Sequence, residues 1–136
     1  MDVNREQINK LLQKPRYHRF LGLSVESIGE GEITLRLPFR QEFLGDENVS
    51  YIHGGVIASL IDVAGDFALI TLLGRGLPTV DMRVDYLRAA KPEDLLATAT
   101  AVKKGRSLGV SDVVVESQSG RKVAVGRALY STAPTK

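Results

Sequence analysis

Two aspartates stand in the most apolar stretch of the sequence, where a carboxylate needs a specific reason to be present. Residues 55–73 are nearly all apolar, yet they include Asp62 and Asp66. Burying a charge without a partner is costly, so two idle carboxylates are not expected there. On a helix, like charges four residues apart repel, which raises the pKa of one of them. A carboxylate tuned in this way is a candidate general base or nucleophile.

A polar stripe runs along this stretch if residues 55–73 form one helix. At ~100° per residue, Gly55, Ser59, Asp62 and Asp66 fall within about 60° of arc, and apolar residues surround the rest, as in a buried helix. The helix dipole acts only within the first turn, so it does not explain Asp62. A solvated face is the alternative, although such faces usually carry Lys, Glu or Gln. The small Gly55 and Ser59 favour the close approach of another backbone.

His53, Gly54 and Gly55 come at the start of the predicted helix. The N–H groups of a first helical turn have no partner within the helix, and glycine lets a ligand oxygen approach them closely. Such donors stabilise oxyanions, so the triplet is a candidate oxyanion hole. A plain turn is the alternative, in which the imidazole of His53 only anchors the loop by hydrogen bonds.

Gly54 and Asp62 are too far apart to act together within one helix. They are eight residues apart, which is about 12 Å along the axis. An oxyanion donor and a nucleophile must each lie ~3 Å from the same carbonyl group. A second copy of the helix, running antiparallel with the polar stripes facing, would bring Gly54 of one chain to Asp62 of the other. The sequence therefore predicts a dimer with two shared active sites.

The elements before the long helix are read from periodicity and turn residues. Residues 4–13 carry apolar side chains at helical spacing, and Pro15 ends that predicted helix. Two strands are predicted at residues 23–28 and 32–37, and a polar loop spans roughly residues 40–52.

After the long helix the period changes to two. In residues 79–88 apolar and polar side chains alternate, which predicts a half-buried strand with four side chains on one face: Val80, Met82, Val84 and Tyr86. Three further strands are predicted at residues 95–103, 108–117 and 122–131. Because no helix separates these late strands, they should pair antiparallel.

The fold class is therefore α+β, with one antiparallel sheet folded around one long helix. We expect a single domain over residues 1–136, with residues 1–16 as an N-terminal helical extension. The chain has no cysteine, which excludes a cysteine metal site and fits a reducing compartment. We expect no signal peptide and no membrane span, because no run of 18 uninterrupted apolar residues occurs.

The positive charge is concentrated in the C-terminal quarter of the chain. Residues 103–136 hold seven Lys or Arg and two acidic residues, although the whole chain has a net charge of only +2. Such a basic segment can meet an anionic partner. The alternative is that these residues are solvated and protect strand edges. Nucleic-acid binding is not favoured, because no base-stacking motif accompanies the basic residues.

Four segments together resemble a known family. They are HGGVIASLID, VDMRVDYLR, GRSLGVSDVVVES and RKVAVGRALYS, and the resemblance covers roughly residues 17–131. The chain resembles the hotdog-fold acyl-CoA thioesterases, in particular the phenylacetyl-CoA thioesterase-like branch. The resemblance implies a long helix wrapped by a five- to six-stranded antiparallel sheet. It also implies hydrolysis of acyl-CoA to free acid and CoA in the cytoplasm, by a homo-oligomer that is a dimer of dimers.

The same resemblance assigns roles to four residues. Gly54 N–H would polarise the thioester carbonyl, and His53 would support its loop. Asp62 would attack directly or activate water, and Thr79 occupies a position often held by a water-orienting Ser or Thr. No metal and no separate cofactor is implied, because coenzyme A is part of the substrate.

Further residues are predicted to contact substrate. They comprise two from the helix stripe, two from the preceding loop and four outside both: Gly55, Asp66, Glu47, Asn48, Arg88, Lys104, Arg106 and Ser107. Of these, Lys104, Arg106 and Arg88 could pair with the phosphates of coenzyme A. The family often shows Asn-x-x-Gly-x-x-His, whereas this chain has Glu47, Ser50 and His53 at those places. Asn48 is one position off, so either the loop is shifted or the substrate differs.

The sequence also contains a pattern that is typical of a different class of hydrolase. Residues 105–109 match G-x-S-x-G, but a strand is predicted after them where a nucleophile elbow needs a helix, and both histidines precede Ser107. Two alternatives remain: a dehydratase or hydratase that uses His53 as a base, and a non-catalytic acyl-CoA binding protein. The acyl group itself is not readable from the sequence.

Overall fold

The computed structural model describes residues 4–134. Its helical elements are α1 (Arg5–Gln13), α2 (Arg16–Leu21), the 3₁₀ turn η1 (Gln41–Phe43) and α3 (Gly54–Leu73). The strands are β1 (Ser24–Gly29), β2 (Glu32–Leu37), β3 (Thr79–Tyr86), β4 (Leu95–Lys104), β5 (Leu108–Ser117) and β6 (Lys122–Ser131).

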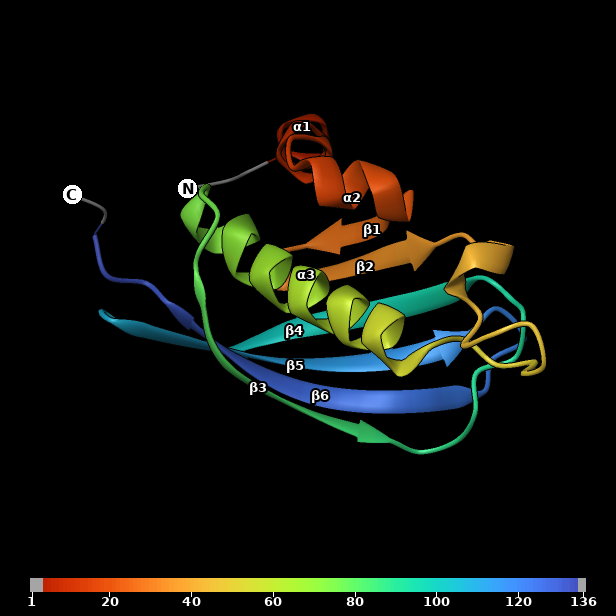
Figure 1. The fold of residues 1–136 in the computed structure, drawn as a ribbon. Helices are drawn as coiled ribbons and strands as arrows, with labels where there is room; N and C mark the ends of the chain where they lie inside the picture. The colour runs from red at the N-terminus through yellow and green to blue at the C-terminus, as the bar shows by residue number, and fades with distance from the viewer. Residues whose placement is uncertain (1–3, 135–136) are drawn as a thin grey trace.

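The strands form one six-stranded sheet in the order β1-β2-β4-β5-β6-β3. Every neighbouring pair is antiparallel. The sheet curves around α3, which lies across one face, while α1 and α2 lie beside α3 near β1 (Figure 1). The predicted fold is confirmed: one long helix wrapped by an antiparallel sheet, with a short N-terminal helix.

The core lies between α3 and the sheet. Leu60, Ile61 and Phe67 of α3 are at most 2% exposed, and they meet inward-facing residues of β4 and β5 such as Ala97 and Val113. These strands alternate in burial with a period of two because one face packs on the helix. Burial of this face fixes the rotation of α3, and therefore the direction of its polar stripe.

α3 also has the length and apolar composition of a membrane-spanning helix. In this fold it is the core helix, and 61% of its most apolar window is buried within the chain. Its composition is therefore explained by packing against the sheet.

Two side chains from the sheet hold the middle of α3. Tyr130 of β6 is fully buried, and its hydroxyl donates to the backbone carbonyl of Asp62 at 2.6 Å. Ser111 of β5 donates to the carbonyl of Gly65 at 2.7 Å. A side chain at Gly65 would collide with the Tyr130 hydroxyl, so glycine is required there by close approach. The segment that carries the two aspartates is thus fixed to β5 and β6.

The structure differs from the sequence prediction at two places. The helix predicted over residues 4–13 ends at Gln13 as expected, but a second helix that was not predicted, α2, begins directly after Pro15. The sequence gives little sign of α2 because it buries only Leu21, so no apolar period marks it. The face of β3 predicted to be half-buried is also more open, since Val80 is 57% and Tyr86 52% exposed. The reason is that β3 is an edge strand.

Candidate active site

His53 caps the N-terminus of α3 with its own ring. Its Nδ1 accepts the backbone N–H of Gly55 at 2.8 Å. An accepting Nδ1 carries no proton, which places the ring proton of the neutral imidazole on Nε2. A Cβ atom at Gly55 would lie 3.0 Å from Nδ1, so the small residue lets the ring fold over the helix start. His53 therefore anchors the loop, as one of the two sequence interpretations required.

Gly54 has the free donor of this first turn. The N–H groups of Val56 and Ile57 bond to the carbonyl of His53, and that of Gly55 bonds to the His53 ring. Gly54 N–H makes no hydrogen bond to any other residue between 4 and 134. An unpaired N–H at a helix N-terminus, where the dipole is positive, suits an oxyanion.

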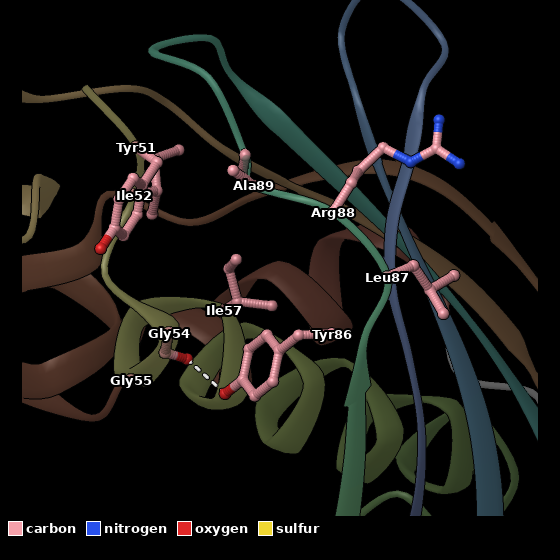
Figure 2. A pocket seen from close by; sticks show the side chains of 10 residues that line it. Tyr51, Ile52, Gly54, Gly55, Ile57, Tyr86, Leu87, Arg88 and Ala89 are labelled. Atoms are coloured by element: carbon pink, nitrogen blue, oxygen red, sulfur yellow. Dashed lines mark hydrogen bonds between the residues drawn. The ribbon is translucent and has the colours of Figure 1, made fainter. Parts of the chain in front are cut away.

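A cavity of about 500 Å³ opens beside this donor. Figure 2 shows Gly54, Ile57 and Tyr86 on one side and Tyr51 and Ala89 across from them. The Tyr86 hydroxyl donates to the Gly54 carbonyl at 2.7 Å, and a Cβ at Gly54 would lie 3.3 Å from that ring. The volume falls within the ~300–1,000 Å³ of small-molecule sites.

Asp62 lies two turns further along α3 and meets Thr79 at the start of β3. The Thr79 hydroxyl donates to Asp62 Oδ1 at 2.7 Å, which leaves the second carboxylate oxygen unbonded within the described chain. Tyr130 holds the backbone of the same residue. Burial, with the negative charges of Asp62 and Asp66, raises the pKa of the Tyr130 phenol, so it remains a donor. The structure thus brings together Asp62 and Thr79, to which the family resemblance assigned roles in one site.

Asp66 is the second carboxyl group of the stripe, and its environment changes its pKa. Burial raises the pKa of Asp66 to about 7, the nearby charge of Asp62 adds to the rise, and a hydrogen bond from Leu77 N–H at 3.1 Å opposes it. The sequence attributed a raised pKa to repulsion between the two carboxylates. Burial is the larger cause, and the charge of Asp62 is the smaller one.

The Asp66→Asn variant is expected to lose less stability than the wild type as the pH rises from 4 to 8. Folded Asp66 keeps its proton up to about pH 7, while the unfolded chain loses it near pH ~4. The free energy of unfolding of the wild type therefore falls through this group as pH rises between those values, and is level above them. The variant has no such proton, so its stability relative to wild type should rise by about 2–4 kcal/mol between pH 4 and pH 8. Urea unfolding at both pH values measures this difference, and an equal difference at both would contradict the burial of Asp66.

Two of the three predicted phosphate-binding residues, Lys104 and Arg106, lie away from Gly54 within one chain. Lys104, Arg106 and Ser107 lie at the turn between β4 and β5. This turn is at the end of the sheet beside the C-terminal half of α3, where Gly109 packs against Leu69 (Figure 1). Arg88 lines the cavity but extends away from Gly54 (Figure 2).

Glu47 and Asn48 lie in an exposed turn before α3. The Asn48 N–H donates to the side chain of Asp46 at 2.6 Å. Their predicted contact with substrate, like the roles assigned to the other site residues, remains a prediction. Within residues 4–134 no three histidine, aspartate or glutamate side chains gather where they could hold a metal ion.

Three tyrosines beside the stripe were missed by sequence reasoning. Tyr86 meets Gly54, Tyr130 meets Asp62, and Tyr17 of α2 shares a 2.7 Å hydrogen bond with Ser59. Each lies at least 30 residues from its partner along the chain. Only the antiparallel pairing of β3 with β6, and the packing of α2 on α3, brings them together, so no local motif marks them.

Comparison with known proteins gives a consistent result. A family model described as the thioesterase superfamily matches residues 50–124. A candidate esterase of Halobacterium salinarum is 35% identical over 122 residues, which cover 82% of this chain and 80% of that protein. The Escherichia coli protein YigI, named a medium/long-chain acyl-CoA thioesterase, is 29% identical over 130 residues, with 84% and 83% covered. A crystal structure of a thioesterase-superfamily protein superimposes with a TM-score of 0.90 at 36% identity, covering 93% of this chain and 96% of that one.

Proposed function

The chain belongs to the thioesterase superfamily, and we propose that the thioester it hydrolyses is an acyl-CoA, which yields a free acid and coenzyme A. The name of the Escherichia coli relative supports this substrate class. The observation that carries the proposal is the free N–H of Gly54 at the start of the same helix that presents Asp62. An oxyanion donor and a carboxylate are the two groups that thioester hydrolysis needs most.

Gly54 and Asp62 have different roles in the proposed reaction. Gly54 N–H binds the thioester oxygen and stabilises the negative charge that it gains in the transition state. In one route, Asp62 takes a proton from water while the water oxygen attacks the carbonyl carbon. In the other, a carboxylate oxygen of Asp62 attacks and forms an anhydride that water then cleaves. In both routes the carbon–sulfur bond breaks, and the sulfur leaves as thiolate and is protonated to free coenzyme A.

Thr79 suits either route. Its hydroxyl engages one oxygen of Asp62, so the second oxygen is the one that can face water or the carbonyl carbon. A hydrogen bond of this kind also fixes the rotamer of the carboxylate, which reduces the reorganisation needed during reaction.

The site is proposed to form between two chains. Gly54 and Asp62 lie on the same helix eight residues apart, about 12 Å along its axis. An antiparallel partner helix, with its polar stripe facing this one, would complete two equivalent sites by two-fold symmetry. The C-terminal half of one α3 then extends past Gly54 of the other. In this proposed dimer, Lys104 and Arg106 of one chain would lie beside the site that contains Gly54 of the other, where they would pair with the phosphates of coenzyme A. A dimer of such dimers and a cytoplasmic location belong to the same proposal.

The hydratase alternative has less support from the geometry. A base at His53 needs an unprotonated ring nitrogen directed at substrate. Its Nδ1 is occupied by Gly55 N–H, and its Nε2 then carries the proton. A binding protein without activity is separated from an enzyme by release of free thiol from acyl-CoA by the wild type.

A hydrolysis panel tests the proposed function. Purified protein is incubated with aryl, short-chain and long-chain acyl-CoA substrates, and the free thiol is measured. We expect thiol release above the uncatalysed rate for at least one class. Crotonyl-CoA hydration, followed by loss of the enoyl absorbance, serves as the competing assay. Hydration without thiol release would contradict the proposal, as would no turnover of any member of the panel.

A further inference from the structure

Asp66 connects the helix that carries Asp62 to the segment that carries Thr79. Its Oδ1 accepts the backbone N–H of Leu77 at 3.1 Å. Leu77 stands two residues before Thr79, in the connection between α3 and β3. Asp62 and Asp66 are one turn apart on the same face of α3. The two carboxylates of the stripe thus meet two points of one short segment.

The other hydrogen bonds of this connection join it to the sheet, to the residue after the sheet and to the last turn of α3, and not to the turns that carry the aspartates. The carbonyl of Pro78 accepts the N–H of Ser131 at 2.9 Å, and the Arg75 side chain donates to the carbonyl of Thr132 at 2.8 Å. The buried side chain of Leu77 belongs to an apolar cluster with Leu69 of α3 and with Ala128 and Tyr130 of β6. Gly74 N–H bonds to the carbonyl of Ile70 at the end of the helix. Among the described residues, Asp66 is the only α3 side chain that hydrogen-bonds to the connection.

Thr79 depends on its backbone for its position. Its side chain is exposed in the chain, so packing does not select its rotamer or its distance from α3. A bulge follows it in the pairing of β3 with β6, where the register shifts between Thr79 and Asp81. Thr79 itself pairs with Tyr130 of β6, so the distance of its hydroxyl from Asp62 is set by that pairing and by the residues before it, which hold the strand end close to the helix.

We propose that Asp66 is a positioning residue, whose carboxyl group holds Leu77 so that Thr79 presents its hydroxyl to Asp62. The proposal rests on the proposed function, because the effect is measured through hydrolysis at Asp62. It differs from the sequence prediction that Asp66 contacts substrate. The group acts through an acceptor oxygen at a fixed place, so it needs neither a charge nor contact with the acyl-CoA.

The titratable groups that face Asp66 agree with this role. They are Asp62 on α3 and Tyr130 on β6. Neither is a cation, so no ion pair keeps Asp66 charged. Burial raises the pKa of Asp66 to about 7, so the neutral form is well populated at neutral pH. Either protonation state retains an oxygen that accepts from Leu77.

Three substitutions separate an acceptor role from a charge role. Asp66→Asn keeps an acceptor oxygen in place but has no charge, and we expect its kcat to stay within about 3-fold of wild type. Asp66→Ala removes the acceptor, and Asp66→Glu keeps the charge but displaces it by one methylene. For both we expect kcat to fall about 10-fold or more with KM within about 2-fold, because misplacement of a group near the reacting atoms mainly slows the chemical step. Should Asp66→Ala not fold, Asp66→Glu carries the same test.

A double-mutant cycle shows whether the effect passes through Thr79. Thr79→Val removes the hydroxyl at nearly constant volume and should itself lower kcat. Once the hydroxyl is absent, adding Asp66→Glu or Asp66→Ala should lower kcat by less than about 2-fold further. If the losses of kcat in the single variants multiply in the double variant, the proposal is overturned. It is also overturned if Asp66→Asn is as inactive as Asp66→Ala, because Asp66 would then take part in the chemistry itself. Wild-type turnover by both Asp66→Ala and Asp66→Glu would overturn it as well.

Failure of this inference is distinguishable from failure of the proposed function. Asp62→Asn is measured with the same substrate on the same day. If Asp62→Asn is inactive while the Asp66 variants all match wild type, the proposed function stands and the positioning role is wrong. If the wild type releases no thiol from any acyl-CoA, the proposed function itself is wrong, and if Asp62→Asn keeps wild-type turnover, Asp62 is not the catalytic carboxylate.

Discussion

Asp62→Asn is expected to lower kcat by at least ~100-fold with the fold intact, which is the scale of a lost general base. The amide oxygen of asparagine still accepts the Thr79 hydroxyl that lies 2.7 Å from Asp62 Oδ1. Asparagine and aspartate have similar helix propensities, and Tyr130 bonds only to the backbone carbonyl of this residue. The substitution therefore removes proton acceptance and nucleophilic attack while it keeps the local contacts. Steady-state kinetics with an acyl-CoA that the wild type hydrolyses measure the loss.

A matched control separates this effect from a general change of charge. Glu30→Gln makes the same carboxylate-to-amide change in the exposed turn between β1 and β2, and its kcat should equal that of wild type. Circular dichroism and thermal unfolding establish that both variants are folded. A folded Asp62→Asn protein with near-normal turnover would remove Asp62 from the mechanism.

The elements that could be predicted are those in which the pattern of apolar and polar residues indicates which side chains are buried. Residues 55–73 are apolar on nearly every side, and the helix found there begins only one residue earlier, at Gly54. The predicted strands at 108–117 and 122–131 match β5 and β6 because each alternates against one buried face. The local pattern is sufficient here because the spacing of the apolar residues indicates both the type of element and the face that it buries.

The parts that could not be predicted depend on contacts between distant residues. Gly65 looks like an ordinary small residue in a helix, and only the Tyr130 hydroxyl beside it shows why no side chain fits. The polar stripe was visible, but the role of Asp66 needs the position of Leu77, which the turn after α3 decides. Likewise α2 has two exposed aromatic residues and one buried leucine, so its helix is set by packing against neighbours and not by its own period.

Gly54→Pro and Asp62→Asn are expected to restore activity when the two inactive proteins are folded together. Proline removes the one N–H of this turn that bonds to no other described residue, and it suits the first position of a helix. The preceding His53 already has the extended backbone, φ −56° and ψ 133°, that a residue before proline prefers. Each variant alone should be nearly inactive, since every site in its own dimer lacks one of the two groups.

Two-fold symmetry sets the amount of activity that returns. In a mixed dimer, one site combines Gly54 of the first chain with Asp62 of the second, and it inherits either both defects or neither. Random mixing makes about half of the dimers mixed, each with one intact site, so about a quarter of wild-type activity should appear. Differently tagged chains, unfolded together in urea and refolded, allow the mixed species to be isolated and assayed.

Gly54→Ala is the matched control, because it adds the same Cβ as proline but keeps the N–H. In the folded chain that Cβ lies 3.3 Å from the Tyr86 ring, so Tyr86 must shift by a few tenths of an ångström in both variants. If loss of the donor causes the defect of Gly54→Pro, Gly54→Ala should retain most of its activity. Equal inactivity of the two would assign the defect to crowding at Tyr86. Isolated mixed dimers without activity, formed from variants that are each folded, would show that Gly54 and Asp62 of different chains do not meet at one carbonyl. Because Gly54 and Asp62 are about 12 Å apart along a single helix, a different residue would then have to supply either the oxyanion donor or the carboxylate.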